Sequence, residues 1–232
     1  MPPYLVGLDL GQAQDSSALV IVEQLYTPPA QPTYAVRHLH RWELGTSYPA
    51  IVRALDATLG RPPLVGRSTL LVDKTGVGAA VVDQIRQTGL ECLGVSVHGG
   101  DATAHVGMNW RVPKRDLVAA VQVTLQGARL QFAEALPLTS VLTSELLNFK
   151  VTIDPQTAHD SYSAWRERDH DDLVLALALA VWWGERETLA RLPRGLTLAL
   201  QGTQKPAPFG GRLSGPRLSL GNRRWADEED EY

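Results

Sequence analysis

The chain has 232 residues, with 22 Lys and Arg against 25 Asp and Glu, a formal net charge of −3 and one cysteine, Cys92. This length allows one substantial domain with its own hydrophobic core, so neither a disulfide nor a structural metal is needed for folding. A single cysteine excludes an intramolecular disulfide and a zinc site built on several cysteines, and it is typical of a reducing, intracellular environment. The net charge excludes bulk attraction as a way to coat nucleic acid, but not a local basic groove.

The first part of the chain predicts three strands in succession. Residues 4–10, 18–22 and 34–42 are short runs that are apolar or alternate between apolar and polar side chains, as half-buried and buried strands do. Polar turn residues separate the first two runs, and the proline-rich residues 27–32 separate the second from the third. We therefore expect a three-stranded meander at the start of the fold.

Helices and strands then alternate. Apolar side chains at helical spacing predict helices over residues 47–59, 78–88, 113–127, 136–149 and 169–187. Short apolar runs predict strands over residues 68–73 and 90–97, and a hairpin is expected from residues 150–153 and 161–165. This order predicts an α/β fold, a mixed sheet with helices on its faces.

The last predicted helix contains the longest apolar run, residues 173–183, which is too short to span a bilayer. Trp182 and Trp183 are neighbours on this helix and point in different directions, so one of them is expected at a partner surface. We expect residues 1–190 to form one domain. Residues 191–232, rich in Gly, Pro, Arg and Ser and with five acids among the last six positions, are expected to form a loosely ordered tail.

Four aspartates stand at positions where a carboxylate is costly to bury. Asp9 and Asp73 each end an apolar strand, and Asp171 and Asp172 open an almost purely apolar helix. Acids held together raise each other's pKa unless a divalent cation neutralises them. Hard oxygen ligands of this kind select Mg²⁺ or Mn²⁺. Three parts of the chain can therefore supply one metal site at one end of the sheet.

Each aspartate also has a purely structural interpretation. Asp9 and Asp73 are at positions where Asp commonly begins a turn, and Asp171 and Asp172 can be first-turn acids favoured by the helix dipole. Asp15 is expected to be a solvated turn residue.

Three sequence elements together resemble a known family. They are Gly-Leu-Asp-Leu-Gly around Asp9, Leu-Leu-Val-Asp-Lys-Thr-Gly around Asp73, and His-Asp-Asp-Leu before an Ala/Leu-rich helix at residues 170–173. They are similar to the nuclease domain of tailed-bacteriophage large terminases, over roughly residues 4–187. The resemblance implies an RNase H-like (RuvC-like) fold, with a mixed five-stranded sheet whose first three strands are antiparallel. It also implies a metal-dependent endonuclease that cuts concatemeric double-stranded viral DNA during genome packaging, in the host cytoplasm and without a membrane partner.

The resemblance also implies roles for the acids. Two-metal hydrolysis of a phosphodiester uses one pair of cations to serve the attacking and the leaving oxygen. Asp9 is then expected to bridge the two metals, Asp73 to hold one and Asp172 the other. Asp171 is expected as a nearby ligand or as a group that orients the ligands, because adjacent residues on a helix point about 100° apart and cannot be equivalent ligands.

Positive charge for the DNA backbone is expected from four residues: Lys74, Arg111, Lys114 and Arg115. Residues 110–115 combine a tryptophan with basic side chains at a predicted helix start, which suits phosphate contact; the alternative is a solvated helix terminus. Setting aside the four acids of the predicted site and the five at the chain end leaves 16 acids against 22 basic residues. The rest of the chain is therefore net basic.

The sequence departs from the large terminases in one respect. A Walker A loop needs Gly-Lys-Ser/Thr, and no Gly-Lys pair occurs in this chain, so no P-loop motor is expected. The chain is then an excised domain, a separately encoded subunit or a remnant with another role. A packaging ATPase, a small terminase or a portal protein is an expected partner.

Three other functions compete with this interpretation. A RuvC-like Holliday-junction resolvase would use the same carboxylates. An actin-like or sugar-kinase ATPase is suggested by residues 7–11, but it needs a second domain for which this chain is too short. A non-catalytic packaging or DNA-binding module would have kept the fold without the activity.

Overall fold

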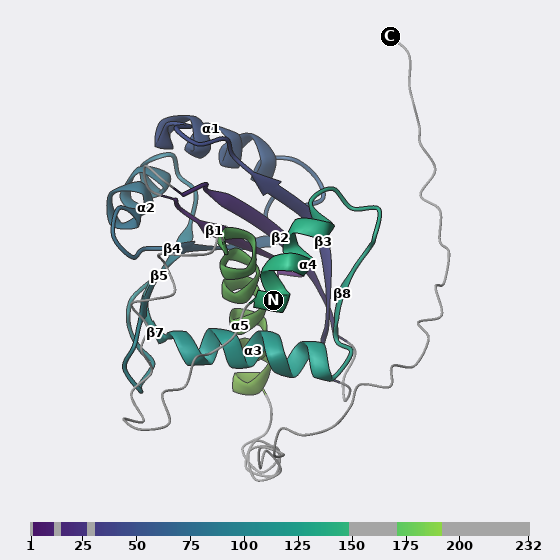
Figure 1. Ribbon diagram of the computed structural model, residues 1–232. Coiled ribbons are helices and arrows are strands. Elements are labelled where there is room, and N and C mark those ends of the chain that lie inside the picture. Colours follow the sequence, from purple (N-terminus) through teal and green to yellow (C-terminus); the bar gives the residue numbers. More distant parts are fainter. Residues whose placement is uncertain (1, 12–14, 27–30, 149–170, 192–232) are drawn as a thin grey trace. The chain divides into compact units, whose positions relative to one another are not determined.

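Among the residues that the structure describes, eight strands form one mixed sheet in the order β6-β7-β5-β4-β1-β2-β3-β8 (Figure 1). The computed structural model describes residues 2–11, 15–26, 31–148 and 171–191, all within Met1–Leu192. The strands are β1 (Tyr4–Asp9), β2 (Ala18–Leu25), β3 (Thr33–Arg41), β4 (Ser68–Asp73), β5 (Cys92–His98), β6 (Ala104–Val106), β7 (Asn109–Pro113) and β8 (Leu130–Phe132). The helices are α1 (Tyr48–Leu59), α2 (Gly78–Gln87), α3 (Lys114–Gln126), α4 (Thr139–Asn148) and α5 (Asp172–Arg191).

The five central strands have the arrangement that the resemblance implies. β1, β2 and β3 form an antiparallel meander, while β4 pairs with β1 and β5 pairs with β4, both in parallel. The prediction of a mixed sheet whose first three strands are antiparallel is confirmed. The sheet is also longer than predicted, because β7 and β6 extend it beyond β5 and β8 extends it beyond β3.

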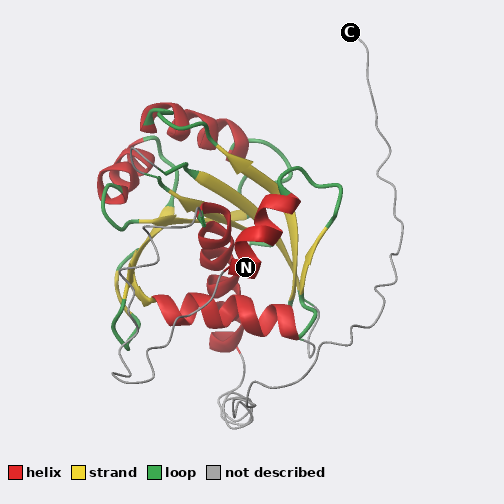
Figure 2. Cartoon of the chain, in the orientation of Figure 1, coloured by secondary structure: helices red, strands yellow, loops and turns green. Residues whose placement is uncertain are grey.

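Helices cover both faces of the sheet (Figure 2). On one face, α1 and α2 bury an apolar cluster that includes Val6, Leu8 and Ile21. On the other face, α5 packs against the strands with α3 and α4 beside it, over a cluster that includes Leu5 and Leu71. The period-two alternation of strand side chains therefore assigns every other residue of β1 and β4 to the α5 face. None of the described helices has the length and apolar character needed to cross a bilayer.

The helix α5 approaches the sheet closely because glycines stand at the contacts. A methyl group on Gly7 of β1 would overlap the carbonyl oxygen of Ala176 in α5. A methyl group on Gly184, farther along α5, would lie 2.5 Å from the ring of Tyr34 and 2.8 Å from Leu5. The first contact is with rigid backbone, so the seating of α5 depends on the missing side chain at Gly7.

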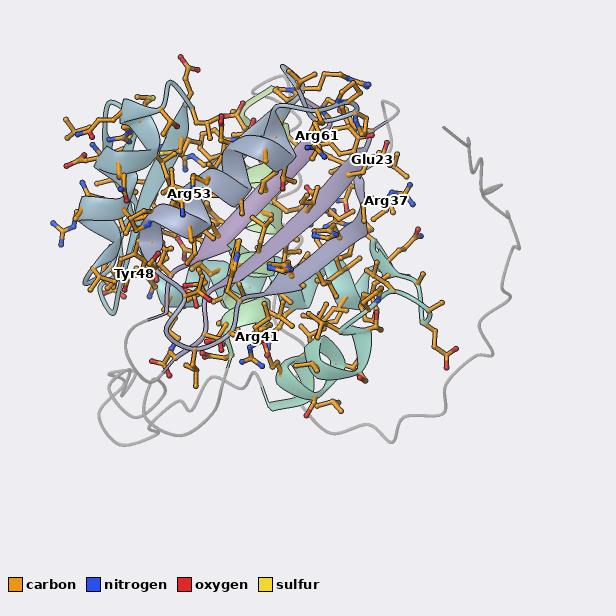
Figure 3. All side chains as sticks on the ribbon, turned by 90° about the horizontal axis from the view of Figure 1, so that it is seen from above. Glu23, Arg37, Arg41, Tyr48, Arg53 and Arg61 are labelled. Carbon is orange, nitrogen blue, oxygen red and sulfur yellow. The ribbon has the colours of Figure 1, made fainter. Side chains whose placement is uncertain are left out.

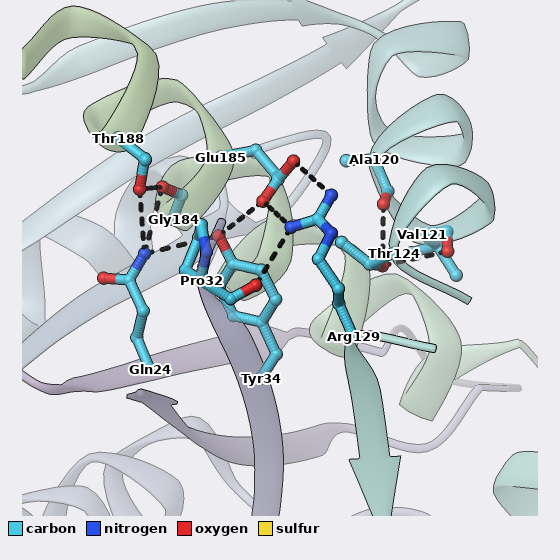
Figure 4. A network of polar contacts seen from close by, with 10 residues as sticks. All are labelled: Gln24, Pro32, Tyr34, Ala120, Val121, Thr124, Arg129, Gly184, Glu185 and Thr188. Atoms are coloured by element: carbon cyan, nitrogen blue, oxygen red, sulfur yellow. Dashed lines mark hydrogen bonds and ion pairs between the residues drawn. The ribbon is translucent and has the colours of Figure 1, made fainter. Parts of the chain in front are cut away.

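A polar network fixes the C-terminal half of α5 (Figure 4). Arg129 donates to both carboxylate oxygens of Glu185 at 2.6 and 2.8 Å, and the Tyr34 hydroxyl donates to the same group at 2.8 Å. Gln24 donates to the carbonyl of Gly184 at 3.2 Å and to Thr188 Oγ1 at 3.1 Å. Burial, with the charge of Glu185 second, raises the pKa of Tyr34, and the hydrogen bonds to Glu185 raise the pKa of Arg129. The network joins α5 to β2, β3 and the start of β8.

The helix predicted over residues 113–127 is α3, which begins at Lys114. The sequence analysis did not expect a strand directly before it, but Asn109–Pro113 form β7. Trp110 is buried on β7, and both Trp182 and Trp183 contact its ring, at centroid distances of 5.8 and 5.4 Å. Both tryptophans of α5 therefore pack on one cluster, Trp182 buried and Trp183 half-buried. The expected hairpin of residues 150–165 and the expected tail lie outside the described residues.

Candidate active site

Asp9 and Asp73 lie side by side at the carboxyl ends of two parallel strands. They are the last residues of β1 and β4, and the preceding residues, Leu8 and Val72, are register partners. Asp73 is two residues after Leu71, whose side chain belongs to the α5-side cluster. Alternation therefore places both carboxylates on the α5 face of the sheet.

The direction of α5 brings Asp172 to the same edge. Ala176 lies over Gly7, and Gly184 lies over Leu5, so the helix runs opposite to β1. Asp172, the first residue of α5 and one turn before Ala176, lies toward the end of β1 that carries its aspartate. Strand register and helix direction thus place these three acids, from distant parts of the sequence, toward one edge and one face of the sheet.

All three carboxylates are buried. Asp9, Asp73 and Asp172 have only 8%, 3% and 4% of their surface exposed. A buried charge is costly unless it is paired, hydrogen-bonded or bound to metal. Their burial means that whatever balances these charges is part of the architecture of the site rather than solvent.

Asp73 has the hydrogen bonds of a turn former and is also placed where a metal ligand is expected. Its Oδ1 accepts from the backbone N–H of Thr75 at 2.8 Å and from the Thr75 hydroxyl at 2.5 Å, which is the hydrogen-bonding of a turn former. Thr75 Oγ1 in turn accepts from the N–H of Val97 on β5 at 3.0 Å. These bonds fix the orientation of the carboxylate at the strand end, which is useful in a metal ligand as well.

Asp172 forms an ion pair with Arg41, the last residue of β3. Arg41 donates from Nη2 at 2.5 Å and from Nε at 3.1 Å to the same oxygen, Oδ2. The sheet register explains the meeting, because Asp9 pairs with Ala18 and Ala18 pairs with Arg41. Figure 3 shows Arg41 at one edge of the sheet, well separated from Arg37 and Glu23.

Glu145 of α4 is a fourth buried acid at the start of α5. Its Oε2 accepts from the N–H of Val174 at 2.9 Å, so it caps the helix N-terminus from a neighbouring helix. Its Oε1 lies 3.7 Å from Nη2 of Arg41 and accepts no hydrogen bond from the described residues. Burial raises the pKa of Glu145 to about 7, against the lowering effects of the Val174 N–H and of Arg41.

Asp171 and Asp172 occupy different environments, as adjacent helix residues must. Asp171 is half-buried and precedes the helix, and its carbonyl accepts the first helical hydrogen bond, from the N–H of Leu175 at 2.9 Å. Asp172 is fully buried and paired with Arg41. Asp15 is exposed, in agreement with its assignment as a solvated turn residue.

The kind of donor atom fits a hard divalent cation, since every acid at this edge offers carboxylate oxygens. The present arrangement is not a finished metal site, however. Within the described ranges, no three His, Cys, Asp or Glu side chains are grouped in a way that could hold a metal ion. Asp172, one of the expected ligands, is bound to Arg41 instead.

The four expected DNA-contacting residues divide into two pairs. Lys74 donates to Asn109 Oδ1 at 3.3 Å, and Arg111 is exposed two residues farther along β7, on the same face as Asn109. Lys114 and Arg115 begin α3, whose start follows the carboxyl end of β7. Arg115 is ion-paired with Asp101 at 2.5 Å. Lys74 directly follows Asp73 at the end of β4, so it stands, like the pair at the start of α3, at the sheet edge where the strands carrying the acids end.

Arg41 and Glu145 are the site residues that sequence reasoning missed. The sequence did contain a signal for Arg41. In an antiparallel meander the third strand ends at the same sheet edge as the first, so a residue at the end of the third strand lies near Asp9. Glu145 had no such signal. It lies on a helix whose neighbouring Ser144 and Leu147 are exposed, and only the packing of α4 on α5 brings it to the site.

Comparison with solved structures finds the same fold in phage large terminases. The large terminase nuclease from the thermophilic phage G20c is 21% identical, with a TM-score of 0.51 over 76% of this chain and 80% of that one. The nuclease domain of the large terminase subunit of bacterial virus Sf6, solved with manganese and β-thujaplicinol, is 14% identical, with a TM-score of 0.54 over 77% of this chain and 87% of that one.

A third similar structure is a longer protein, the large terminase of another thermophilic bacteriophage. It is 13% identical, with a TM-score of 0.53 over 78% of this chain but only 39% of that one. The chain therefore spans less than half of that large terminase. Neither a protein-family model nor a curated protein matches the sequence. At these identities the comparisons show the fold, that of the large terminase nuclease domains.

Proposed function

We propose that this chain is a divalent-metal-dependent endonuclease of the large-terminase type that cuts double-stranded DNA by phosphodiester hydrolysis. The observation that carries the proposal is the convergence of Asp9, Asp73 and Asp172, all buried, at one edge and on one face of the sheet. Three buried carboxylates at one edge are costly for folding, and a bound cation would offset that cost. The shared fold with terminase nuclease domains supports the same conclusion.

The chain's own acids have separable roles in this proposal. Asp9, Asp73 and Asp172 hold two Mg²⁺ or Mn²⁺ ions, and Thr75 keeps the Asp73 carboxylate in orientation through its two hydrogen bonds. Asp171, at the start of α5, is a nearby ligand or orients the others. When bound, two such cations would supply the charge that activates a water molecule and stabilises the leaving oxygen of the phosphodiester.

The DNA backbone is expected to pass the start of α3. Lys114 and Arg115 lie there, at the edge of the sheet where the acids stand, and basic side chains at a helix start suit phosphate groups. Lys74, which directly follows Asp73, and Arg111 on β7 are part of the same proposal. The proposed role in cutting concatemeric viral DNA during packaging, with an ATPase, a small terminase or a portal protein as partner, is supported by the fold alone.

A plasmid cleavage assay tests the proposal. Supercoiled plasmid is incubated with the protein and Mn²⁺ or Mg²⁺, in parallel with Asp9→Asn, Asp172→Asn and the exposed control Asp15→Asn. We expect nicking and linearisation by the wild type and by the control, metal dependence that EDTA abolishes, and loss of cutting in the two site variants. An intact plasmid with wild-type protein contradicts the proposal, and so does undiminished cutting by both site variants.

The substrate preference needs a second arm of the same assay. A four-way junction and a linear duplex of the same sequence are offered at equal concentration. Similar cutting of both supports the terminase-type assignment. Cutting confined to the junction would instead identify a RuvC-like resolvase.

A further inference from the structure

The guanidinium of Arg41 lies near two carboxylates, those of Asp172 and Glu145, and it is hydrogen-bonded to only one of them. Its guanidinium is hydrogen-bonded to Asp172 at 2.5 Å, while Glu145 Oε1 is 3.7 Å away, outside hydrogen-bonding distance. Arg41 is also the cation that the described contacts place on the expected ligand Asp172. A carboxylate that binds a guanidinium through one oxygen is a weaker ligand for a metal ion, because the two cations compete for the same charge.

Glu145 is built to receive the guanidinium. Its Oε2 is fixed by the Val174 N–H at 2.9 Å, which holds the carboxylate in place at the start of α5. Its Oε1 is buried and accepts no hydrogen bond from the described part of the chain. A buried acceptor without a hydrogen bond costs free energy, and a small movement of the Arg41 side chain would remove that cost.

We propose that Arg41 is a positioning residue that passes from Asp172 to Glu145 when a divalent cation binds, and that this exchange sets the metal affinity of the site. The inference rests on the proposed function, since it assigns Asp172 to a metal. It accounts for the contrast between donor atoms that suit a divalent cation and a grouping that is not yet a metal site. Without metal, Arg41 neutralises Asp172; with metal, Glu145 holds Arg41 out of the site.

The test is the affinity for Mn²⁺, measured by calorimetry or by electron paramagnetic resonance at pH 8 without DNA. Removing the competing cation in Arg41→Gln should tighten Mn²⁺ binding roughly tenfold, the size of one charge-assisted hydrogen bond. Glu145→Gln removes the carboxylate charge that would receive Arg41. Mn²⁺ binding should then weaken roughly threefold, because Arg41 stays on Asp172. The matched control is Arg37→Gln, which removes the same charge from an exposed ion pair on the same strand and should leave Mn²⁺ affinity unchanged.

The double variant Arg41→Gln/Glu145→Gln separates the exchange from simple electrostatics. If Glu145 acts through Arg41, the double variant binds Mn²⁺ as tightly as Arg41→Gln alone. If Glu145 only attracts the metal by its charge, Glu145→Gln weakens Mn²⁺ binding equally in the wild type and in Arg41→Gln. That result would contradict the proposed exchange of Arg41 between the two acids. Unchanged or weaker Mn²⁺ binding in Arg41→Gln also overturns it.

Failure of the inference and failure of the proposed function give different results. Saturable Mn²⁺ binding by the wild type that is lost in Asp9→Asn supports the metal site, whatever the Arg41 variants do. Absence of binding by the wild type overturns the metal site and the exchange together. Binding that is the same in the wild type, Arg41→Gln and Arg37→Gln overturns the exchange alone.

Discussion

The two ends of α5 carry polar clusters of opposite character. At the C-terminal end, Arg129, Tyr34 and Gln24 saturate the carboxylate of Glu185 and the nearby helix carbonyl with hydrogen bonds (Figure 4). At the N-terminal end, the buried carboxylates of Asp172 and Glu145 share one guanidinium, that of Arg41. We call the C-terminal end the matched end, because the charge of Glu185 is paired with that of Arg129. We call the N-terminal end the crowded end, because it holds more buried carboxylates than Arg41 can pair with.

The difference separates stability from function along one helix. A buried ion pair with every group satisfied fixes the position of the helix. A cluster of buried like charges is unfavourable for folding, and such features are found where a protein binds ligands or performs chemistry. The matched end therefore anchors α5, and the crowded end is where we propose that a divalent cation binds.

The largest expected effect comes from Gly7→Ala, because the new methyl group meets the backbone of Ala176. Neither strand nor helix can move without disturbing the core, so we expect the free energy of unfolding to fall by about 4 kcal/mol or more. Chemical denaturation measures it. The comparison variant is Gly184→Ala, whose methyl group meets the side chains of Tyr34 and Leu5 instead. It should be the milder of the two, and equal losses would show that the backbone contact at Gly7 is unimportant.

Breaking the matched end should be the next largest effect. Arg129→Met leaves Glu185 charged and largely buried, so the free energy of unfolding should fall by about 3 kcal/mol. The double variant Arg129→Met/Glu185→Leu removes both charges and should recover part of the loss. Equal stability of the wild type and Arg129→Met in urea denaturation would contradict the anchoring role.

Glu145→Gln should change the pH dependence of stability. The pKa of Glu145 is raised from 4.5 to about 7 in the folded protein, so between these values the folded state keeps a proton that the unfolded state has lost. The free energy of unfolding of the wild type should therefore fall as pH rises from about 4.5 through 7, by about 3 kcal/mol from this group. Gln loses no proton, so the variant should gain stability relative to the wild type between pH 5 and pH 8. A constant difference across that range would contradict the assignment.

The smallest effect on stability is expected at Arg115. Its ion pair with Asp101 is on the surface, with 45% of the Arg115 side chain exposed, and Arg115→Ala should change the free energy of unfolding by less than about 0.5 kcal/mol. Its proposed phosphate contact should show instead in DNA binding, as weaker affinity and a shallower salt dependence. Filter binding at several salt concentrations measures both. Unchanged affinity and salt dependence would remove Arg115 from the DNA-binding surface.

The central sheet was predictable because its strands carry strong local patterns. Residues 4–10 and 68–73 are apolar runs that contain or end in Asp, and both became strands that end in Asp. β6 was not predictable, since all of its residues are exposed and it exists only through pairing with β7. β7 was not expected either, because its five residues mix polar, basic and apolar side chains and lie directly before the start of α3.

The candidate site divides in the same way. The edge that gathers Asp9, Asp73 and Asp172 follows from strand ends and a helix start, which the sequence displays. Arg41 and Glu145 belong to the site through the register of β3 and the docking of α4 on α5. Such contacts between distant segments leave no local pattern, so sequence reasoning finds the acids and misses the residues that surround them.

The most direct test of the contrast is the rate of plasmid nicking per folded molecule, measured side by side for Asp9→Asn and Arg129→Met in Mn²⁺. Asp9→Asn should lose about a hundredfold or more in rate while keeping or gaining stability, because a repelling charge is gone. Arg129→Met should lose stability and keep the rate of its folded fraction. Wild-type nicking by Asp9→Asn, or an equal loss of rate per folded molecule in Arg129→Met, would contradict the division of α5 into an anchoring end and a functional end.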